Sequence, residues 1–170
     1  LSPSELLFVT RETDREHLLE LARYADVSQL VFLTDANCWR GDAVDHKEFV
    51  QWLSDLLEIG LDTFASVLRS LDYEMLVSSF KRCLDVVKTE HEVRIDEIVG
   101  DAPYFTLDNL YYIMVKEESH FQTIRLAVEV IYDRQKELYF ELIEGILSEL
   151  DSEIEEDAFS LREERLAEKG

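Results

Sequence analysis

Residues 35–60 read DANCWRGDAVDHKEFVQWLSDLLEIG, a polar stretch that leads into an amphipathic one. Asp45 and Glu48 form an approximate capping box, in which side chains satisfy free N–H groups of a first helical turn. Five apolar residues behind it share one helix face, namely Phe49, Trp52, Leu53, Leu56 and Leu57. Gly60 is a typical helix stop. The stretch therefore predicts a capped helix that ends at Gly60 and buries Trp52.

Similar helix signals recur on both sides of this stretch. Asp26 is expected to cap a helix over VSQLVFL, and Asp72 a helix over residues 73–88 with Cys83 on its inner side. LARYADVSQLVFL (21–33) also aligns with VLRSLDYEMLVSS (67–79), and helix–Asp–helix is typical of α-solenoid units. The predicted fold class is mainly α, a helical-repeat or superhelical array of short antiparallel helices.

The helical pattern breaks once. Aromatic and β-branched residues on both sides of Asp108-Asn109 predict one small β-hairpin near 103–115. We therefore expect a single helical domain over 1–170, with a helical-repeat half (1–89), an irregular hairpin connector (90–118) and C-terminal helices (119–170). The last helix is predicted to begin at Asp151, with Ile154, Ala158, Leu161 and Leu166 inward. Because the chain begins with Leu, it can be a fragment of a longer protein.

Composition disfavours several classes of partner. The chain has a net charge of −21, which disfavours binding to nucleic acid and to anionic membranes. No apolar run reaches the roughly 18–20 residues that span a bilayer. The N-terminus has no pattern of a secretory leader, and Cys38 and Cys83 form no disulfide framework. We therefore expect a cytoplasmic protein with two reduced cysteines, of which Cys83 is buried and inert.

The residues that could carry chemistry form incomplete sets. Glu117-x-x-His120 has the spacing of di-iron helical bundles, but those sites need a second such pair and two further glutamates. Asp14-x-x-His17-x-x-Glu20 lies opposite the leucines of its helix and is interpreted as a solvated face. Cys38 and His46 lack the partner pair of a zinc site. We therefore predict no catalytic residue, no metal site and no cofactor.

The chain also resembles a bacterial family of unknown function. The likeness rests on LTDANCWRGD, WLSDLLEIG, FTLDNLYYI, ELYFELIEGILSEL and DSEIEEDAFSLREERLAEKG, in that order. It implies an all-helical domain and brings no activity. The short helix–Asp–helix units are similar to the intracellular N-terminal superhelical domain of MgtE-type magnesium transporters. That second resemblance implies regulatory Mg²⁺ binding, with no ligand residue that carries over.

These patterns favour recognition over catalysis. We expect a non-catalytic protein-interaction or regulatory helical module, whose partner is another protein or another region of the same full-length protein, with self-association also open. The alternatives are an acidic domain that senses Mg²⁺ or another divalent cation, and a cysteine- or metal-dependent enzyme. The candidate interaction surface comprises Trp39, Arg40, Asp42, Tyr104, Phe105, Tyr111 and Tyr112. The structural alternative is that these rings seal the junctions between the hairpin and the helices, and that Arg40 forms a salt bridge with a nearby acid.

Overall fold

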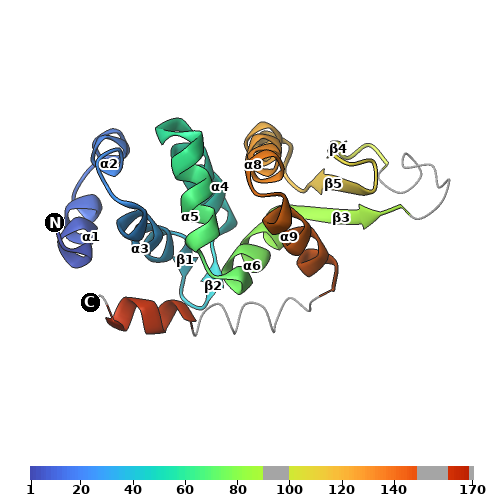
Figure 1. Cartoon of the computed structure of the whole chain (residues 1–170). Coiled ribbons are helices and arrows are strands. Elements are labelled where there is room, and N and C mark those ends of the chain that lie inside the picture. Colours follow the sequence, from blue (N-terminus) through green and yellow to red (C-terminus); the bar gives the residue numbers. More distant parts are fainter. Residues whose placement is uncertain (90–99, 149–160, 169–170) are drawn as a thin grey trace.

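The helix α4 (His46–Ile59) lies at the centre of the fold in this computed structural model, which describes residues 1–89, 100–148 and 161–168. It contacts α2, α3, α5, α6 and α8, and Figure 1 shows α4 and α5 between α3 and α8. Asp45 caps α4 by accepting from the backbone N–H groups of Lys47 and Glu48, and Trp52 is buried. Gly60 follows its last residue. The helix predicted from the opening stretch is therefore confirmed, with its cap and its buried tryptophan.

Five helices of the described chain, α2, α3, α5, α6 and α8, pack against α4. Asp26 caps α3 as predicted, by accepting from the N–H of Gln29. Residues 161–168 are also helical. The mainly helical fold class is confirmed. The start of the last helix at Asp151 lies outside the described residues. The other named helices are α1 (Pro3–Arg11), α2 (Arg15–Ala22), α3 (Val27–Asn37), α5 (Leu61–Ser70), α6 (Tyr73–Cys83), η1 (Glu118–His120), α8 (Phe121–Arg134) and α9 (Lys136–Ser148).

The helix predicted over residues 73–88 is too long. It ends at Cys83, and the next five residues form strand β3 (Leu84–Lys88). The physical reason is the period of its side chains, because Leu84 and Val86 are buried while Asp85 is exposed. That alternation of two residues suits one covered face of a sheet and does not fit a helix. Cys83 is buried, as predicted.

The predicted hairpin is confirmed and belongs to a larger sheet. Strands β4 (Tyr104–Thr106) and β5 (Tyr111–Val115) pair antiparallel, and β3 pairs with the other edge of β5. In the turn, Asp108 accepts from two backbone N–H groups, and Asn109 has a left-handed φ of 58°. Asn tolerates this conformation better than most residues. Figure 1 shows the sheet at the opposite end of the molecule from α1.

The polar-aromatic connector of the opening stretch forms a second, minimal ribbon. Strands β1 (Trp39–Arg40) and β2 (Ala43–Val44) pair antiparallel, and Gly41 takes the left-handed φ of 63° that their tight turn requires. Arg40 forms an ion pair with Asp45, the capping residue of α4. The expected pairing of Arg40 with a nearby acid is confirmed.

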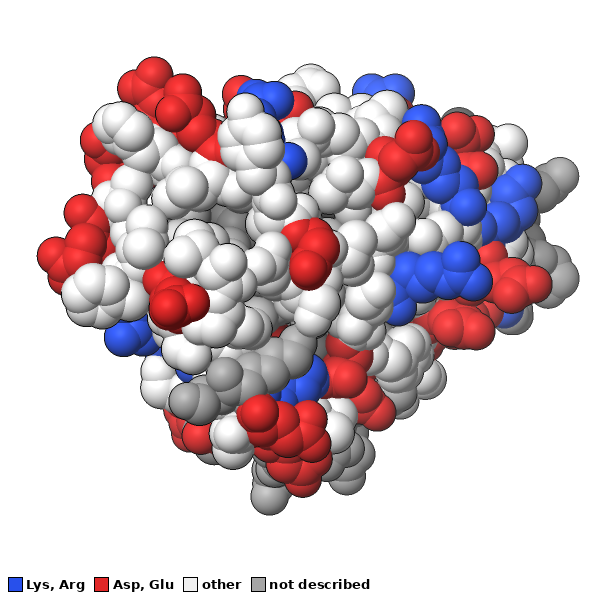
Figure 2. Space-filling model, turned by 60° about the vertical axis from the view of Figure 1, so that its left-hand side comes forward, with Lys and Arg blue, Asp and Glu red and all other residues white. Residues whose placement is uncertain are grey.

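Acidic side chains are distributed over the face of the molecule that Figure 2 draws. Figure 2 shows Asp and Glu side chains spread over one face among uncharged residues, with fewer Lys and Arg side chains. In the part of the chain that is described, no helix combines the length and the apolar character needed to cross a membrane.

Gly145 lies where α9 meets α6, and its lack of a side chain permits that approach. A Cβ there would overlap the Tyr73 hydroxyl and lie 2.9 Å from a Val77 methyl carbon. The Tyr73 hydroxyl donates to the Glu141 carbonyl at 3.0 Å, which holds the ring in place.

We expect Gly145→Ala to lower the free energy of unfolding by up to about 2 kcal/mol in urea melts. Overpacking costs about 1–3 kcal/mol, and the better helix propensity of Ala recovers about 1 kcal/mol. Gly60→Ala is the control, because the nearest atom to a Cβ there is Thr63 Oγ1 at 3.8 Å. A Gly145→Ala variant more stable than wild type would contradict this packing.

Candidate functional site

The helix of residues 161–168, here called the C-terminal helix, brings two arginines to the end of α3. Arg165 faces the Asp35 carboxylate with two nitrogens, Nε at 2.5 Å from Oδ2 and Nη2 at 2.6 Å from Oδ1. Asp35 is only 1% exposed. A bidentate guanidinium–carboxylate pair combines charge with fixed geometry, so it is among the strongest and most specific polar contacts.

Three further contacts surround this pair. Arg162 Nε donates to the backbone carbonyl of Asp35 at 2.9 Å, and its guanidinium carbon lies 5.6 Å from the centroid of the Trp39 ring. Arg165 also pairs with Asp72. We call Asp35, Trp39 and Asp72 together the arginine acceptor. These residues come from α3, β1 and the residue before α6, and the two arginines come from far along the chain.

The end of α3 makes the arginine acceptor electrically negative. Asp35 lies in the last turn, where the helix dipole already disfavours an anion, and that turn contains no basic residue. The Asp35 carbonyl is also one of the last four of the helix, which have no partner within it. Arg165 compensates the carboxylate and Arg162 satisfies the carbonyl. The acceptor therefore requires a cation that also donates several hydrogen bonds, and a guanidinium meets both conditions.

Asp72 serves the arginine acceptor instead of capping its own helix. It occupies the N-cap position of α6, but its side chain makes no capping hydrogen bond. Its carboxylate pairs with Arg165 instead. The prediction that Asp72 caps this helix is therefore wrong for its side chain, because a cation lies within its reach.

The structure separates the predicted interaction residues into two groups. Trp39, Phe105 and Tyr111 are buried, so the expectation of exposed rings is wrong for these three. Trp39 lies beneath Arg162, Phe105 packs edge-on against Phe121 at 5.9 Å between ring centroids, and the Tyr111 hydroxyl donates to Glu144. Their rings seal junctions between elements, which was the alternative interpretation.

The other four predicted residues retain exposed or half-exposed side chains. Arg40 and Asp42 lie in the β1–β2 ribbon next to Trp39 and are exposed. Tyr104 and Tyr112 lie on neighbouring strands of the three-stranded sheet, with ring centroids 6.1 Å apart. The connector and the hairpin therefore belong to different sheets of the described chain.

Sequence reasoning missed Asp35, Arg162 and Arg165 as a unit. Two signals were present: an acid in the last turn of an apolar helix, and an Arg-x-x-Arg spacing that places two guanidinium groups on one helix face. Neither signal predicts which residue forms the contact, because 127 residues separate Arg162 from Asp35. Only the fold brings them together.

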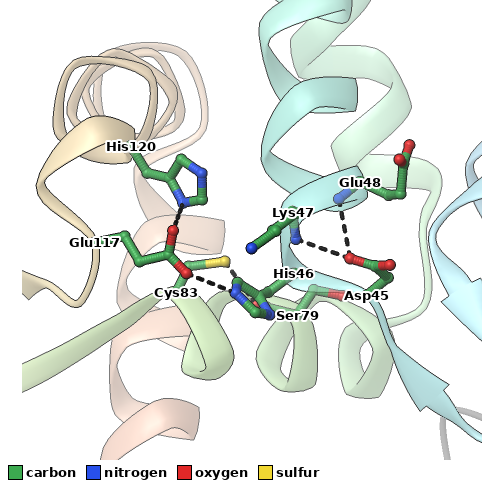
Figure 3. Close-up of polar contacts among 8 residues, drawn as sticks. All are labelled: Asp45, His46, Lys47, Glu48, Ser79, Cys83, Glu117 and His120. Atoms are coloured by element: carbon green, nitrogen blue, oxygen red, sulfur yellow. Dashed lines mark hydrogen bonds and ion pairs between the residues drawn. The ribbon is translucent and has the colours of Figure 1, made fainter.

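A second polar cluster joins α4 to the end of the sheet (Figure 3). Glu117 Oε1 lies 2.8 Å from His46 Nε2, and Glu117 Oε2 lies 3.6 Å from His120 Nδ1. The E-x-x-H pair noted in the sequence is therefore part of a His–Glu–His cluster. One carboxylate bridges two imidazoles, which positions η1 against the start of α4.

Neither the geometry of the described residues nor the state of the nearby thiol favours metal or thiolate chemistry at this cluster. Among the described residues, no three His, Cys, Asp or Glu side chains are arranged to hold a metal ion. Cys83 Sγ donates to the Ser79 carbonyl at 3.3 Å, and burial raises the pKa of the Cys83 thiol to about 12. Burial also raises the pKa of Cys38 well above its ordinary value. Both thiols are therefore protonated at neutral pH, where a nucleophile would need a thiolate.

The polar strip on α2 is solvated, as predicted. Asp14, His17 and Glu20 are exposed. Asp14 caps α2 through the backbone N–H of His17, and it also lies 2.8 Å from His17 Nδ1. The strip lines an open hollow with Leu21 and Tyr24. Asp14 and His17 pair with one another, which accounts for their spacing in the sequence.

The Glu117–His46 contact predicts a pH dependence of stability. The hydrogen bond with His46 lowers the pKa of Glu117, and His120 and Lys47 lower it further by their charge. A carboxyl group whose pKa is lower in the folded state stabilises the fold above its unfolded pKa, about 4.3. That contribution is lost as the pH falls through the folded pKa.

We therefore expect wild type to exceed Glu117→Gln in free energy of unfolding at pH 5.5, and this difference to disappear in urea melts at progressively lower pH below about 4. Glu118→Gln removes one negative charge from the neighbouring residue and is the control. A difference that is independent of pH would contradict a stabilising ionised Glu117.

Comparison with known proteins identifies the family and nothing more specific. Neither a curated protein nor a solved structure matches the chain. The expected likeness to the magnesium-transporter domain therefore receives no support. A family model described as "Family of unknown function (DUF6178)" matches residues 1–170, the whole chain. The resemblance to a family of unknown function is confirmed, and the chain belongs to the DUF6178 family.

Proposed function

We propose that the chain is a non-catalytic protein-interaction module, and that the arginine acceptor is its docking surface for a helix that carries arginines. The observation that carries this proposal is the bidentate contact of Arg165 with Asp35, a carboxylate that is 1% exposed. The chain supplies an example of the ligand itself, because its own helix presents two arginines to the acceptor. The docked helix defines the chemistry that the surface accepts.

The chemistry of the acceptor supports recognition of arginine over lysine. Asp35 receives two parallel N–H donors, and Trp39 offers the face of an aromatic ring to a second guanidinium. A lysine ammonium is a compact charge that makes neither a planar fork nor a stacked contact of the same kind. Arginine and tryptophan are also enriched among the residues that dominate binding energy at protein interfaces.

Several observations support the wider prediction of a cytoplasmic interaction module built from helical repeats. Two buried free thiols suit a reducing compartment. Asp26 and Asp72 each precede a helix, and the aligned Leu30 and Leu76 are both buried. These shared features favour α2–α3 and α5–α6 as related units. Arg40 and Asp42 follow Trp39 in the ribbon, so part of the predicted interaction surface borders the acceptor.

A peptide-binding experiment tests the proposed docking surface. The probe is a fluorescent capped peptide of residues 158–170, and the protein is the full chain with Arg162→Gln and Arg165→Gln, which vacate the acceptor. We expect saturable binding by anisotropy. Peptides in which Lys or Gln replaces both arginines should bind at least about tenfold more weakly, because they lose a charge-assisted bidentate contact.

Variants of the protein supply the matched control. Asp35→Asn in the vacated protein should abolish binding, whereas Asp133→Asn removes the same charge from an exposed position on α8 and should leave the affinity within about twofold. Circular dichroism verifies the fold of each variant. Equal binding of the Arg and Gln peptides, or no saturable binding up to about 1 mM, would contradict an arginine-recognising surface.

A further inference from the structure

We infer that the C-terminal helix is a displaceable internal occupant of the arginine acceptor, and that the partner which replaces it is a basic helix with the same Arg-x-x-Arg spacing. This inference rests on the proposed function and adds its regulation and its partner class. In the closed form the chain inhibits its own docking surface. In the open form the surface is free for the partner.

The contacts of the C-terminal helix suit an occupant that can leave. Its covered side consists of the two arginines together with Leu161 and Leu166, and each of these four side chains is only partly buried. The core helices, in contrast, bury their apolar residues almost completely, as Leu53 and Phe80 do. The helix is therefore held mainly by its ion pairs and hydrogen bonds with the acceptor, which another guanidinium-bearing helix can reproduce.

The C-terminal segment, residues 158–170, has no net charge, although the rest of the chain is strongly acidic. Residues 158–170 contain three basic side chains, Arg162, Arg165 and Lys169, and three acidic ones, Glu163, Glu164 and Glu168. The segment is therefore neutral, and the rest of the chain carries the whole net charge of −21. A helix that keeps the two arginines without the acids would gain long-range attraction that the internal helix lacks.

One contact within the segment also favours a partner helix that lacks the acidic residues. Arg162 Nη1 donates to Glu163 Oε1 at 2.8 Å, so part of the guanidinium is engaged by its own neighbour instead of the acceptor. In a partner without an acid beside its first arginine, Nη1 would be available to the acceptor as well as Nε, the atom that donates to the Asp35 carbonyl. The acceptor thus favours a basic helix over its internal occupant, through long-range charge attraction and through the direct contacts of the first arginine.

Competition between the two helices gives a quantitative expectation. A partner binds only the fraction of molecules in which the acceptor is open, so the apparent Kd rises in inverse proportion to that fraction. The test uses a capped peptide of residues 158–170 with E163Q, E164Q and E168Q, which is basic, and the unchanged neutral peptide. The proteins are the wild-type full chain, the Arg162→Gln/Arg165→Gln variant and an Arg11→Gln/Arg125→Gln variant, which loses two positive charges elsewhere.

We expect the basic peptide to bind the Arg162→Gln/Arg165→Gln protein at least about tenfold more tightly than wild type, which corresponds to an acceptor that is open in about a tenth of wild-type molecules or fewer. The Arg11→Gln/Arg125→Gln protein should behave as wild type. In ¹⁵N-labelled wild type, the amide signals of residues 161–168 should move, as unlabelled peptide is added, to their positions in the Arg162→Gln/Arg165→Gln protein. At low salt the basic peptide should bind more tightly than the neutral one.

The outcomes that overturn the inference are separate from those that overturn the proposed function. Equal affinity for wild type and the Arg162→Gln/Arg165→Gln protein, or binding that leaves the signals of residues 161–168 in place, would refute internal competition while the docking surface stands. Equal binding of the basic and neutral peptides at low salt would refute the basic partner class. Absence of binding by either peptide to the Arg162→Gln/Arg165→Gln protein would refute the proposed function and this inference together.

Discussion

The ion pair between Asp35 and Arg165 is the constraint on which the account of this protein depends. A carboxylate in the last turn of α3 opposes the helix dipole, and burial to 1% exposure removes the water that would otherwise stabilise it. A buried charge is tolerated when it is paired and hydrogen-bonded. Arg165 supplies the opposite charge, and two of its nitrogens donate hydrogen bonds to the carboxylate. Because Arg165 belongs to a segment far along the chain, this local requirement fixes the C-terminal helix against α3. The same requirement defines what any replacement would have to offer.

The central helix α4 explains why the arginine acceptor has a defined geometry. Trp52 donates through Nε1 to Thr34 Oγ1 at 2.5 Å, one residue before Asp35, and so ties α4 to the end of α3. Phe49 packs edge-on against Phe80 of α6, with ring centroids 5.2 Å apart. Asp35 and Asp72 therefore belong to helical units that pack on a common support. A site held by packed helices is pre-organised, so less of the binding free energy is lost to ordering it. The His46–Glu117–His120 cluster plays a comparable part at the other side of α4, where it joins the sheet to the first turn.

The sequence predicted those features whose signals are local. The capped start of α4, the buried Trp52, the hairpin around Asp108-Asn109 and the Arg40 ion pair all depend on residues close together in the chain. The prediction of a helix through Leu84–Lys88 was wrong because it overlooked the two-residue alternation of this run, which pairs with β5 as a strand. The burial of Trp39 and the pairing of Asp72 with Arg165 depend on a helix more than 90 residues away, which no local pattern reveals. The candidate site therefore shares Trp39 with the predicted interaction surface, whereas tertiary contacts add Asp35 and Asp72.

A double-mutant cycle between Asp35 and Arg165 tests the central claim most directly. The free energies of unfolding of wild type, Asp35→Asn, Arg165→Gln and the double variant are measured in urea, all in the full chain. If the two side chains form a buried pair, the double variant is more stable than the sum of the single losses implies, with a coupling free energy of about 1 kcal/mol or more. Coupling within about 0.3 kcal/mol of zero, the range of independent sites, would contradict the account, because the C-terminal helix would then not be held by the acceptor.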